Sequence, residues 1–305
     1  MIPILSVITT TYNSSKYICD TIIAVLDQDV NFEFEYLISD DCSSDDTVKL
    51  VSNLKNSHPK GEYIRLLRNQ NNLGVMKNFF KAVNQSRGKY IAFCDSDDLW
   101  IDKKKIFKQI GFLEKNKKCV MAYHSFVNKM HSSLDIEIFN KEEPINVILK
   151  NPQTSTMIVR GILRNLVNKS VVDEALSLND QYLRFVLKDY GNFEFVKGIK
   201  PNIRLIREGS IFGGLKKLEK KRIALQSWKT FYKYHGFGSN KKYLLRRVNR
   251  FQSRVNWLEF KNDAKFDLFL KAVAHDFKFN IFFEKIFEKI KKQIFTFLRI
   301  LFVKN

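Results

Sequence analysis

The chain has 305 residues, enough to bury a substantial core, and its hydrophobic content of 45% with few Gly or Pro argues against a disordered protein. Its net charge of +20 favours negatively charged partners: nucleic acid, an anionic membrane surface or phosphorylated small molecules. The amino terminus lacks the pattern of a signal peptide, and no apolar run reaches about 18 residues, so we expect a cytoplasmic protein without a spanning helix. The cysteines form no C-x-x-C pair, and we expect reduced thiols at Cys19, Cys42, Cys94 and Cys119.

The first 125 residues alternate short β-rich runs with helical patterns. Apolar, β-branched runs predict strands at 4–9, 35–39, 63–67 and 90–94. Apolar residues recurring every three or four positions predict helices at 15–29, 45–54 and 75–84, and Ser44 is the expected N-cap of the second. Strands that alternate with helices imply right-handed crossovers and a mostly parallel sheet covered on both faces.

The alternation is less regular after residue 125. We expect strands at 155–159, 193–196 and 203–206, and helices at 161–168 and 180–189. From Leu215 onward nearly every segment has a helical pattern rich in Lys, Arg and Phe. This change predicts a catalytic-type domain at 1–214, with halves 1–126 and 127–214, followed by a helical region at 215–305.

Three polar loops follow predicted strands and would meet at the carboxyl edge of the sheet, where open α/β sheets bind ligands. They are Thr9 to Asn13, Asp40-Asp41 and Asp95-Ser96-Asp97-Asp98. Three carboxylates so close together repel one another and favour a counter-cation, and oxygen ligands suit Mg²⁺ or Mn²⁺ held together with substrate phosphates. An acidic turn before a helix is the simpler alternative for the third loop. A packing role for Tyr12 and a turn-forming role for Asp41 are the alternatives in the other two.

The same segments resemble family 2 glycosyltransferases of the GT-A fold, of the bacterial surface-polysaccharide type. The resemblance rests on four motifs in the expected order: 5–13, 37–47, 71–75 and 88–100. It is close over about 3–126, weaker over 150–214 and absent afterwards. It implies an inverting transferase with a Rossmann-like α/β domain that takes a sugar from a nucleotide diphosphate donor, usually a UDP-sugar, with Mn²⁺ or Mg²⁺.

The resemblance also implies roles for particular residues. Thr10 and Tyr12 would line the base pocket, and Asp41 would bind the uracil. Asp97 and Asp98 would hold ribose and metal, with Asp95 a further candidate ligand. The family places its general base at an acidic residue that opens a helix, and Asn179-Asp180 resembles that element; a charge placed favourably at a helix start is the alternative for Asp180. Many relatives carry a His where this chain has Glu208, which would then be a further metal ligand beside diphosphate.

The last 28 residues predict a basic amphipathic helix, since Phe, Ile and Leu recur at helical spacing over 278–305 with lysines between them. We expect peripheral contact with the inner face of the cell membrane through this tail; packing on the domain or in a homodimer is the alternative. The expected acceptor is a glycan or a lipid-linked glycan. Two other classes stay open: a transferase-like membrane scaffold without catalysis, and, least favoured, a nucleic-acid-binding protein, for which no recognition motif is present.

Overall fold

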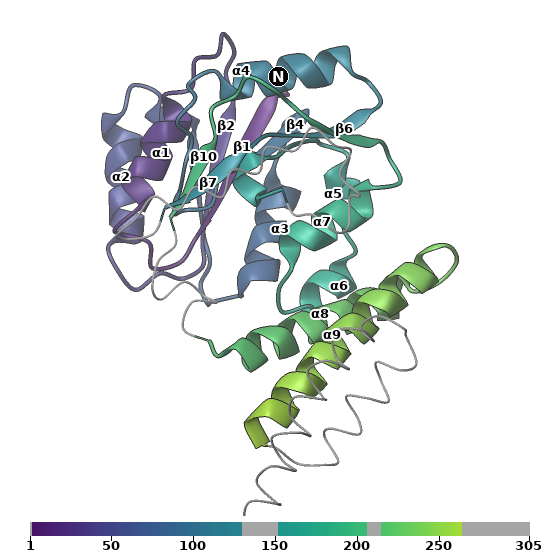
Figure 1. Cartoon of the computed structure of the whole chain (residues 1–305). Coiled ribbons are helices and arrows are strands. Elements are labelled where there is room, and N and C mark those ends of the chain that lie inside the picture. The colour runs from purple at the N-terminus through teal and green to yellow at the C-terminus, as the bar shows by residue number, and fades with distance from the viewer. Residues whose placement is uncertain (1, 130–151, 206–214, 264–305) are drawn as a thin grey trace, which may run out of the picture. The chain divides into compact units, whose positions relative to one another are not determined.

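The structure is a computed structural model that describes residues 2–129, 152–205 and 215–263. The chain divides into two compact units, Met1–Gly214 and Leu215–Asn305. The predicted Glu208 and the tail at 278–305 lie outside the described residues. Figure 1 shows the first unit as a sheet flanked by helices, and the described part of the second unit as helical.

A seven-stranded sheet forms the centre of the first unit, in the order β3-β2-β1-β4-β8-β6-β9. The four strands that the sequence predicted in the first half are parallel to one another, whereas β8 is antiparallel to both of its neighbours. The prediction of a mostly parallel sheet is therefore confirmed. The strands span Leu5–Thr11 (β1), Glu35–Asp40 (β2), Ile64–Arg68 (β3), Tyr90–Phe93 (β4), Cys119–Tyr123 (β6), Ile158–Arg160 (β8) and Asn192–Phe195 (β9).

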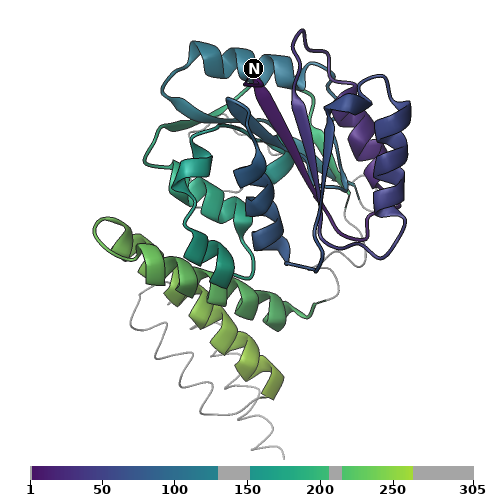
Figure 2. The same ribbon diagram turned by 180° about the vertical axis from the view of Figure 1, so that it is seen from behind.

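Helices cover both faces of this sheet, because alternate strand residues are apolar on both sides. Val7 faces α1 and α4 in one core cluster, while the neighbouring Ile8 is buried on the opposite side. Helices α1 and α2 pack together on one face and α3 packs on β1 and β2 from the other, as Figures 1 and 2 show from opposite sides. The helices span Ile18–Leu26 (α1), Thr47–Ser57 (α2), Val75–Gln85 (α3), Lys105–Lys115 (α4), Leu163–Leu166 (α5), Lys169–Glu174 (α6) and Asn179–Leu187 (α7).

The start of α2 differs from the prediction. Its N-cap residue is Asp46, not Ser44, and the Asp45 carboxylate accepts hydrogen bonds from the Thr47 backbone and hydroxyl at 3.0 and 2.5 Å. Ser44 instead donates its backbone N–H to Asn13 in the neighbouring loop. The prediction of Ser44 as N-cap was wrong because the Asn13 side chain, from another loop, binds Ser44.

A second, three-stranded sheet joins distant parts of the first unit in the order β5-β10-β7. Its strands are Asp98–Leu99 (β5), Phe126–Lys129 (β7) and Asn202–Leu205 (β10). Asp98 is the register partner of Arg204 across the antiparallel β5–β10 pair. The last carboxylate of the acidic loop is therefore fixed in a strand.

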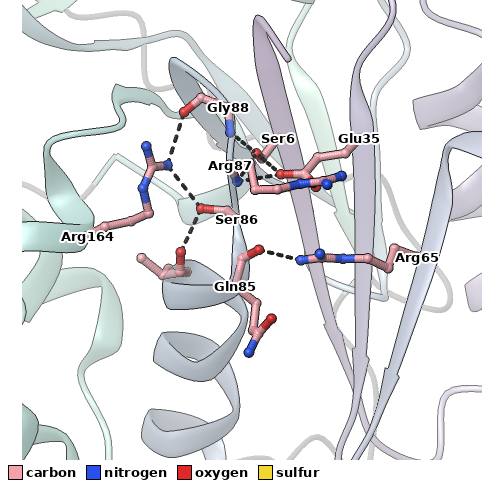
Figure 3. A network of polar contacts seen from close by, with 9 residues as sticks. Ser6, Glu35, Arg65, Gln85, Ser86, Arg87, Gly88 and Arg164 are labelled. Atoms are coloured by element: carbon pink, nitrogen blue, oxygen red, sulfur yellow. Dashed lines mark hydrogen bonds and ion pairs between the residues drawn. The ribbon is translucent and has the colours of Figure 1, made fainter. Parts of the chain in front are cut away.

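A polar network ties together the amino ends of β1, β2 and β4 (Figure 3). The buried Glu35 carboxylate accepts the Ser6 hydroxyl at 2.6 Å, and from Arg87 it accepts the backbone N–H at 2.5 Å and Nε at 3.0 Å. Gly88 lies so close to β1 that a Cβ there would come within 2.4 Å of the Ser6 nitrogen. Arg164 donates to the Ser86 hydroxyl and the Gly88 carbonyl at 3.2 and 3.0 Å, which secures the same turn from α5.

The described part of the second unit, residues 215–263, forms an antiparallel helical hairpin of α8 (Lys217–His235) and α9 (Asn240–Asp263). Trp228 is the centre of its core: the ring is 1% exposed and packs against Phe231, Tyr243 and Phe251 with centroids 5.2–6.3 Å apart. Arg222 of α8 pairs with Glu259 of α9 at 2.7 Å. No described helix is both long and apolar enough to cross a bilayer.

Candidate active site

The three polar loops meet at the carboxyl edge of the large sheet. Ser14, after β1, exchanges a hydroxyl hydrogen bond with Ser96 of the acidic loop at 2.9 Å. The Ser14 backbone N–H donates to the Thr47 hydroxyl at 2.8 Å, and the Asn13 N–H donates to the Ser43 hydroxyl at 2.9 Å. Side-chain hydrogen bonds thus connect the first loop to both of the others.

Positive φ angles occur in two of these loops and at the start of α7. The non-glycine residues with positive φ in the described chain are Asn13 (47°), Cys42 (65°) and Leu178 (73°). Each lies within two residues of a side chain that the sequence analysis selected: Tyr12, Asp41 and Asp180 respectively. Such conformations cost about 1–3 kcal/mol each and tend to cluster at functional sites.

The predicted nucleotide-binding residues differ in how much solvent they see. Tyr12 is 38% exposed at the rim, so its ring is available for stacking, and Thr10 at the end of β1 is half-buried. Asp41 is 4% exposed and its carboxylate is already engaged: Oδ1 accepts Asn69 Nδ2 and the Leu73 N–H at 2.8 Å, and Oδ2 accepts the Gly74 N–H at 2.9 Å. Asp41 thereby orders the loop before α3, a contact that the sequence did not reveal.

The carboxylates of the acidic loop differ in their solvent exposure. Asp95 and Asp97 are half-buried, whereas Asp98 is 1% exposed. Oδ2 of Asp98 accepts a hydrogen bond from Gln153 Nε2, while its Oδ1 has no hydrogen-bond partner among the described residues. Burial, followed by the charges of Asp95 and Asp97, raises the pKa of Asp98 well above its ordinary value. The charges of Asp95 and Asp97 therefore disfavour ionisation of the buried Asp98 carboxyl.

These residues fit a hard divalent cation by their donor set. Carboxylate oxygens are the ligands that Mg²⁺ and Mn²⁺ prefer, and Asp98 supplies a buried oxygen that lacks a donor. No three His, Cys, Asp or Glu side chains in the described part of the chain form a complete metal cage. A cation that shares its ligands between one or two carboxylates and a substrate phosphate would need no such cage.

A buried lysine lies close to the acidic loop. Lys105 is fully buried, its Nζ lies 3.8 Å from the centroid of the Trp100 ring, and burial lowers its pKa to about 7. Cys94, directly after β4, is also fully buried, and burial together with Asp98 raises its pKa well above the usual value. The four cysteines are free thiols, as predicted; Cys94 and Cys119 are buried, whereas Cys42 is exposed.

The predicted base is linked to the acidic loop by a segment that the sequence analysis did not select. Asp180 lies in the first turn of α7 and pairs with Arg184 at 3.1 Å. Arg184 is 3% exposed and donates to the Pro152 carbonyl at 3.1 Å, and the next residue, Gln153, donates to Asp98. Residues 152–153 thus bridge the two predicted catalytic elements. A lone Gln far from any motif gives no sequence signal of this role.

The bridge is itself held from two sides. The Ser155 hydroxyl donates to Gln153 Oε1, which orients the amide so that its nitrogen faces Asp98. The Ser155 carbonyl accepts Trp100 Nε1 at 3.0 Å and Asn202 Nδ2 at 2.7 Å. The Gln153 amide is therefore held through Ser155, which is itself fixed by Trp100 and by Asn202 of β10.

The chain is similar in sequence to known proteins. The chain is 36% identical over 124 residues to the putative teichuronic acid biosynthesis glycosyltransferase TuaG of Bacillus subtilis, covering 41% of this chain and 47% of TuaG. It is 34% identical over 123 residues to the UDP-Glc:alpha-D-GlcNAc-diphosphoundecaprenol beta-1,3-glucosyltransferase WfaP of Escherichia coli, covering 40% and 46%. The matches span about half the length of these relatives and about a third of the length of the similar mycobacterial proteins.

The fold extends further than the sequence similarity. The crystal structure of Staphylococcus aureus TarS 1–349 in complex with UDP-GlcNAc superimposes with a TM-score of 0.64 at 20% identity, over 89% of this chain and 79% of that one. The profile described as glycosyl transferase family 2 matches residues 6–169, more than half of the chain. With the parallel sheet, the three converging loops and these matches together, the chain belongs to glycosyl transferase family 2.

Proposed function

We propose that the protein is an inverting, metal-dependent glycosyltransferase that moves a sugar from a UDP-sugar to a hydroxyl of a glycan or lipid-linked acceptor during surface polysaccharide or glycolipid synthesis. The observation that carries the proposal is the loop 95–98, where three carboxylates gather at the carboxyl edge of the sheet and one oxygen of Asp98 lacks a donor. The printed names of relatives support the substrate class: WfaP uses UDP-Glc, and TarS was crystallised with UDP-GlcNAc.

The donor nucleotide would bind across the first two loops. Tyr12 is exposed enough to stack on the uracil, with Thr10 beside it at the end of β1. Asp41 already accepts three hydrogen bonds from protein groups, so it would contribute to the base pocket with the remaining acceptor capacity of Oδ2 and by ordering Leu73 and Gly74.

Asp97 and Asp98, with Asp95 as a further ligand and Glu208 as the least supported one, would hold Mn²⁺ or Mg²⁺. The cation would supply Lewis-acid stabilisation of the leaving diphosphate. The protein's own contribution is positional: Gln153 and the β5–β10 pairing hold the Asp98 carboxylate in place. Asp97, which is half-buried, would also reach the donor ribose.

Asp180 would remove the proton from the acceptor hydroxyl as that oxygen attacks the anomeric carbon opposite the diphosphate. Its side chain is 23% exposed, so an acceptor can reach it, and Arg184 holds it in orientation. General-base catalysis of this kind contributes roughly 10²–10⁴ in rate. The acceptor in the WfaP name is lipid-linked, which supports an enzyme that works at the inner face of the cell membrane, with the tail 278–305 as one contact.

Calorimetry with UDP and Mn²⁺, together with transfer assays on UDP-sugars, tests this proposal. We expect Asp98→Ala to weaken metal-dependent UDP binding and to abolish transfer. Asp180→Asn should keep UDP binding and lose transfer by roughly 10²–10⁴.

Two results would contradict the assignment in different ways. Near-normal transfer by Asp180→Asn would remove this residue from the role of base. Metal-dependent UDP binding by the wild-type protein without hydrolysis or transfer of any donor would favour a scaffold that has lost catalysis.

A further inference from the structure

The helical hairpin of the second unit carries half of the net charge of the chain. Helices α8 and α9 contain thirteen Lys or Arg against three Asp or Glu, a net +10 of the chain's +20. Two of the three acids are engaged within the hairpin: Glu219 accepts the Lys216 N–H at 2.8 Å, and Glu259 pairs with Arg222. The hairpin core explains the apolar residues but not this excess of cations.

Several of these cations converge on one place. Lys221 of α8 and Arg254 of α9 lie over the same ring, with Nζ at 5.6 Å and Cζ at 5.5 Å from the Phe251 centroid. Burial and neighbouring cations, Arg250 among them, lower the pKa of both Lys221 and Arg254. Like charges held together against an aromatic surface cost energy unless an anion approaches.

The turn of the hairpin adds an apolar group. Phe237, between α8 and α9, is 68% exposed, more than any other aromatic residue that the structure describes. Lys241 and Lys242 begin α9 and are both exposed. An exposed aromatic side chain next to lysines suits the interface of an anionic membrane, where the ring enters the head-group region and the ammonium groups meet phosphates.

We propose that the α8–α9 hairpin is a membrane-docking surface for anionic phospholipid head groups, with Phe237 inserted at its tip. The partner that complements this charge is a lipid bilayer. The cations extend along two helices about 29 Å and 36 Å long at the usual helical rise, and they do not surround a single small ligand. The proposed surface is made of other residues than the tail at 278–305, and it does not depend on the transferase activity.

Flotation of the full chain with vesicles tests this surface. The wild-type protein should float with vesicles that contain phosphatidylglycerol and not with pure phosphatidylcholine, and binding should fall as salt rises. Lys241→Glu with Lys242→Glu should lower the partition coefficient at least about tenfold, and Phe237→Ser should lower it further. A further variant, Arg250→Gln with Arg254→Gln, removes cations of the cluster around Phe251. Its flotation is compared with that of the wild type only if the two proteins unfold at the same temperature.

A charge-matched control separates a local surface from bulk charge. Lys55→Glu with Lys118→Glu changes the same charge at two exposed lysines of the first unit and should float like wild type. Equal loss in this control, or unchanged flotation of the Lys241 and Lys242 variant, would overturn the proposal. So would tighter, hairpin-dependent binding to a single-stranded oligonucleotide than to anionic vesicles. The flotation assay contains no sugar donor, so a negative result would leave the transferase proposal intact.

Discussion

The large sheet has one buried carboxylate where its parallel strands begin, the amino edge, and another where they end, the carboxyl edge. The two carboxylates differ in how fully they are hydrogen-bonded. At the amino edge, Glu35 has donors for both oxygens, from Ser6 and Arg87 (Figure 3). At the carboxyl edge, Asp98 is buried beside two further carboxylates and keeps one oxygen without a donor among the described residues. A satisfied carboxylate supports the fold, whereas an unsatisfied one is tolerated where a ligand completes it.

The difference has a plain consequence for mutagenesis. Changes at the amino edge should alter stability and leave chemistry alone, because their partners are other parts of the fold. Changes at the carboxyl edge should alter binding and turnover at smaller cost in stability, because the charge there already opposes folding.

Glu35→Ala should give the largest effect on stability. It leaves the Ser6 hydroxyl and the Arg87 N–H without their carboxylate acceptor in a buried turn, which should cost about 2–3 kcal/mol of unfolding free energy. Urea unfolding measures this loss, and Glu35→Gln, which keeps one acceptor, should lose less. Normal stability of the Ala variant, or loss of UDP binding by its folded fraction, would break the contrast between the edges.

Gln153→Ala should affect activity more than stability. Removing the donor that fixes Asp98 should weaken apparent Mn²⁺ affinity and turnover by roughly 10–100-fold. Initial rates at increasing Mn²⁺ concentrations measure this change. Ser155→Ala, which removes only the hydrogen bond to the Gln153 oxygen, serves as the milder control. An unchanged dependence on metal would mean that Gln153 merely fills space.

Lys105→Met tests the carboxyl edge through the pH dependence of the unfolding free energy. The folded-state pKa of Lys105 is about 7 and the ordinary value is 10.5, so between these values the unfolded chain binds a proton that the folded chain lacks. The wild-type unfolding free energy should therefore rise with pH above about 7, by at most about 1.4 kcal/mol per unit. Urea unfolding at about pH 7.5 and about pH 9 should show a steeper rise for wild type than for the Met variant. Equal slopes would contradict the buried, neutral lysine.

Sequence periodicity was sufficient for the parallel half of the fold. Strands such as 90–94 and helices such as 75–84 lie within one or two residues of the observed elements, because each carries its own apolar repeat. The meeting of the three loops also followed from the sequence, since parallel strands share a carboxyl edge. These features depend on local pattern and on a general rule of topology.

The environment of the carboxylates did not follow from the sequence. β5 is only two residues long, too short for any periodic signal, yet it decides that Asp98 points inward while Asp97 stays half-exposed. Gln153 lies 55 positions away and meets Asp98 only through tertiary packing. The prediction named the acidic residues and left their individual roles open because burial and partners are properties of the fold.

Glu114→Gln, at the amino edge, should have the smallest effect on the unfolding free energy. Glu114 accepts hydrogen bonds from Lys89, Tyr90 and Lys117 at 2.5–2.8 Å, and the bond from Lys117, followed by the others, lowers its pKa to about 2. Because the folded pKa lies below the ordinary 4.5, these contacts stabilise the protein above about pH 4.5, and the stabilisation is lost as pH falls toward 2. The side chain is 38% exposed, so screening should hold the loss in Glu114→Gln below about 1 kcal/mol at neutral pH. Urea unfolding should show the two proteins converging in acid; a gap that persists at low pH would mean that the carboxylate acts through packing and not through charge.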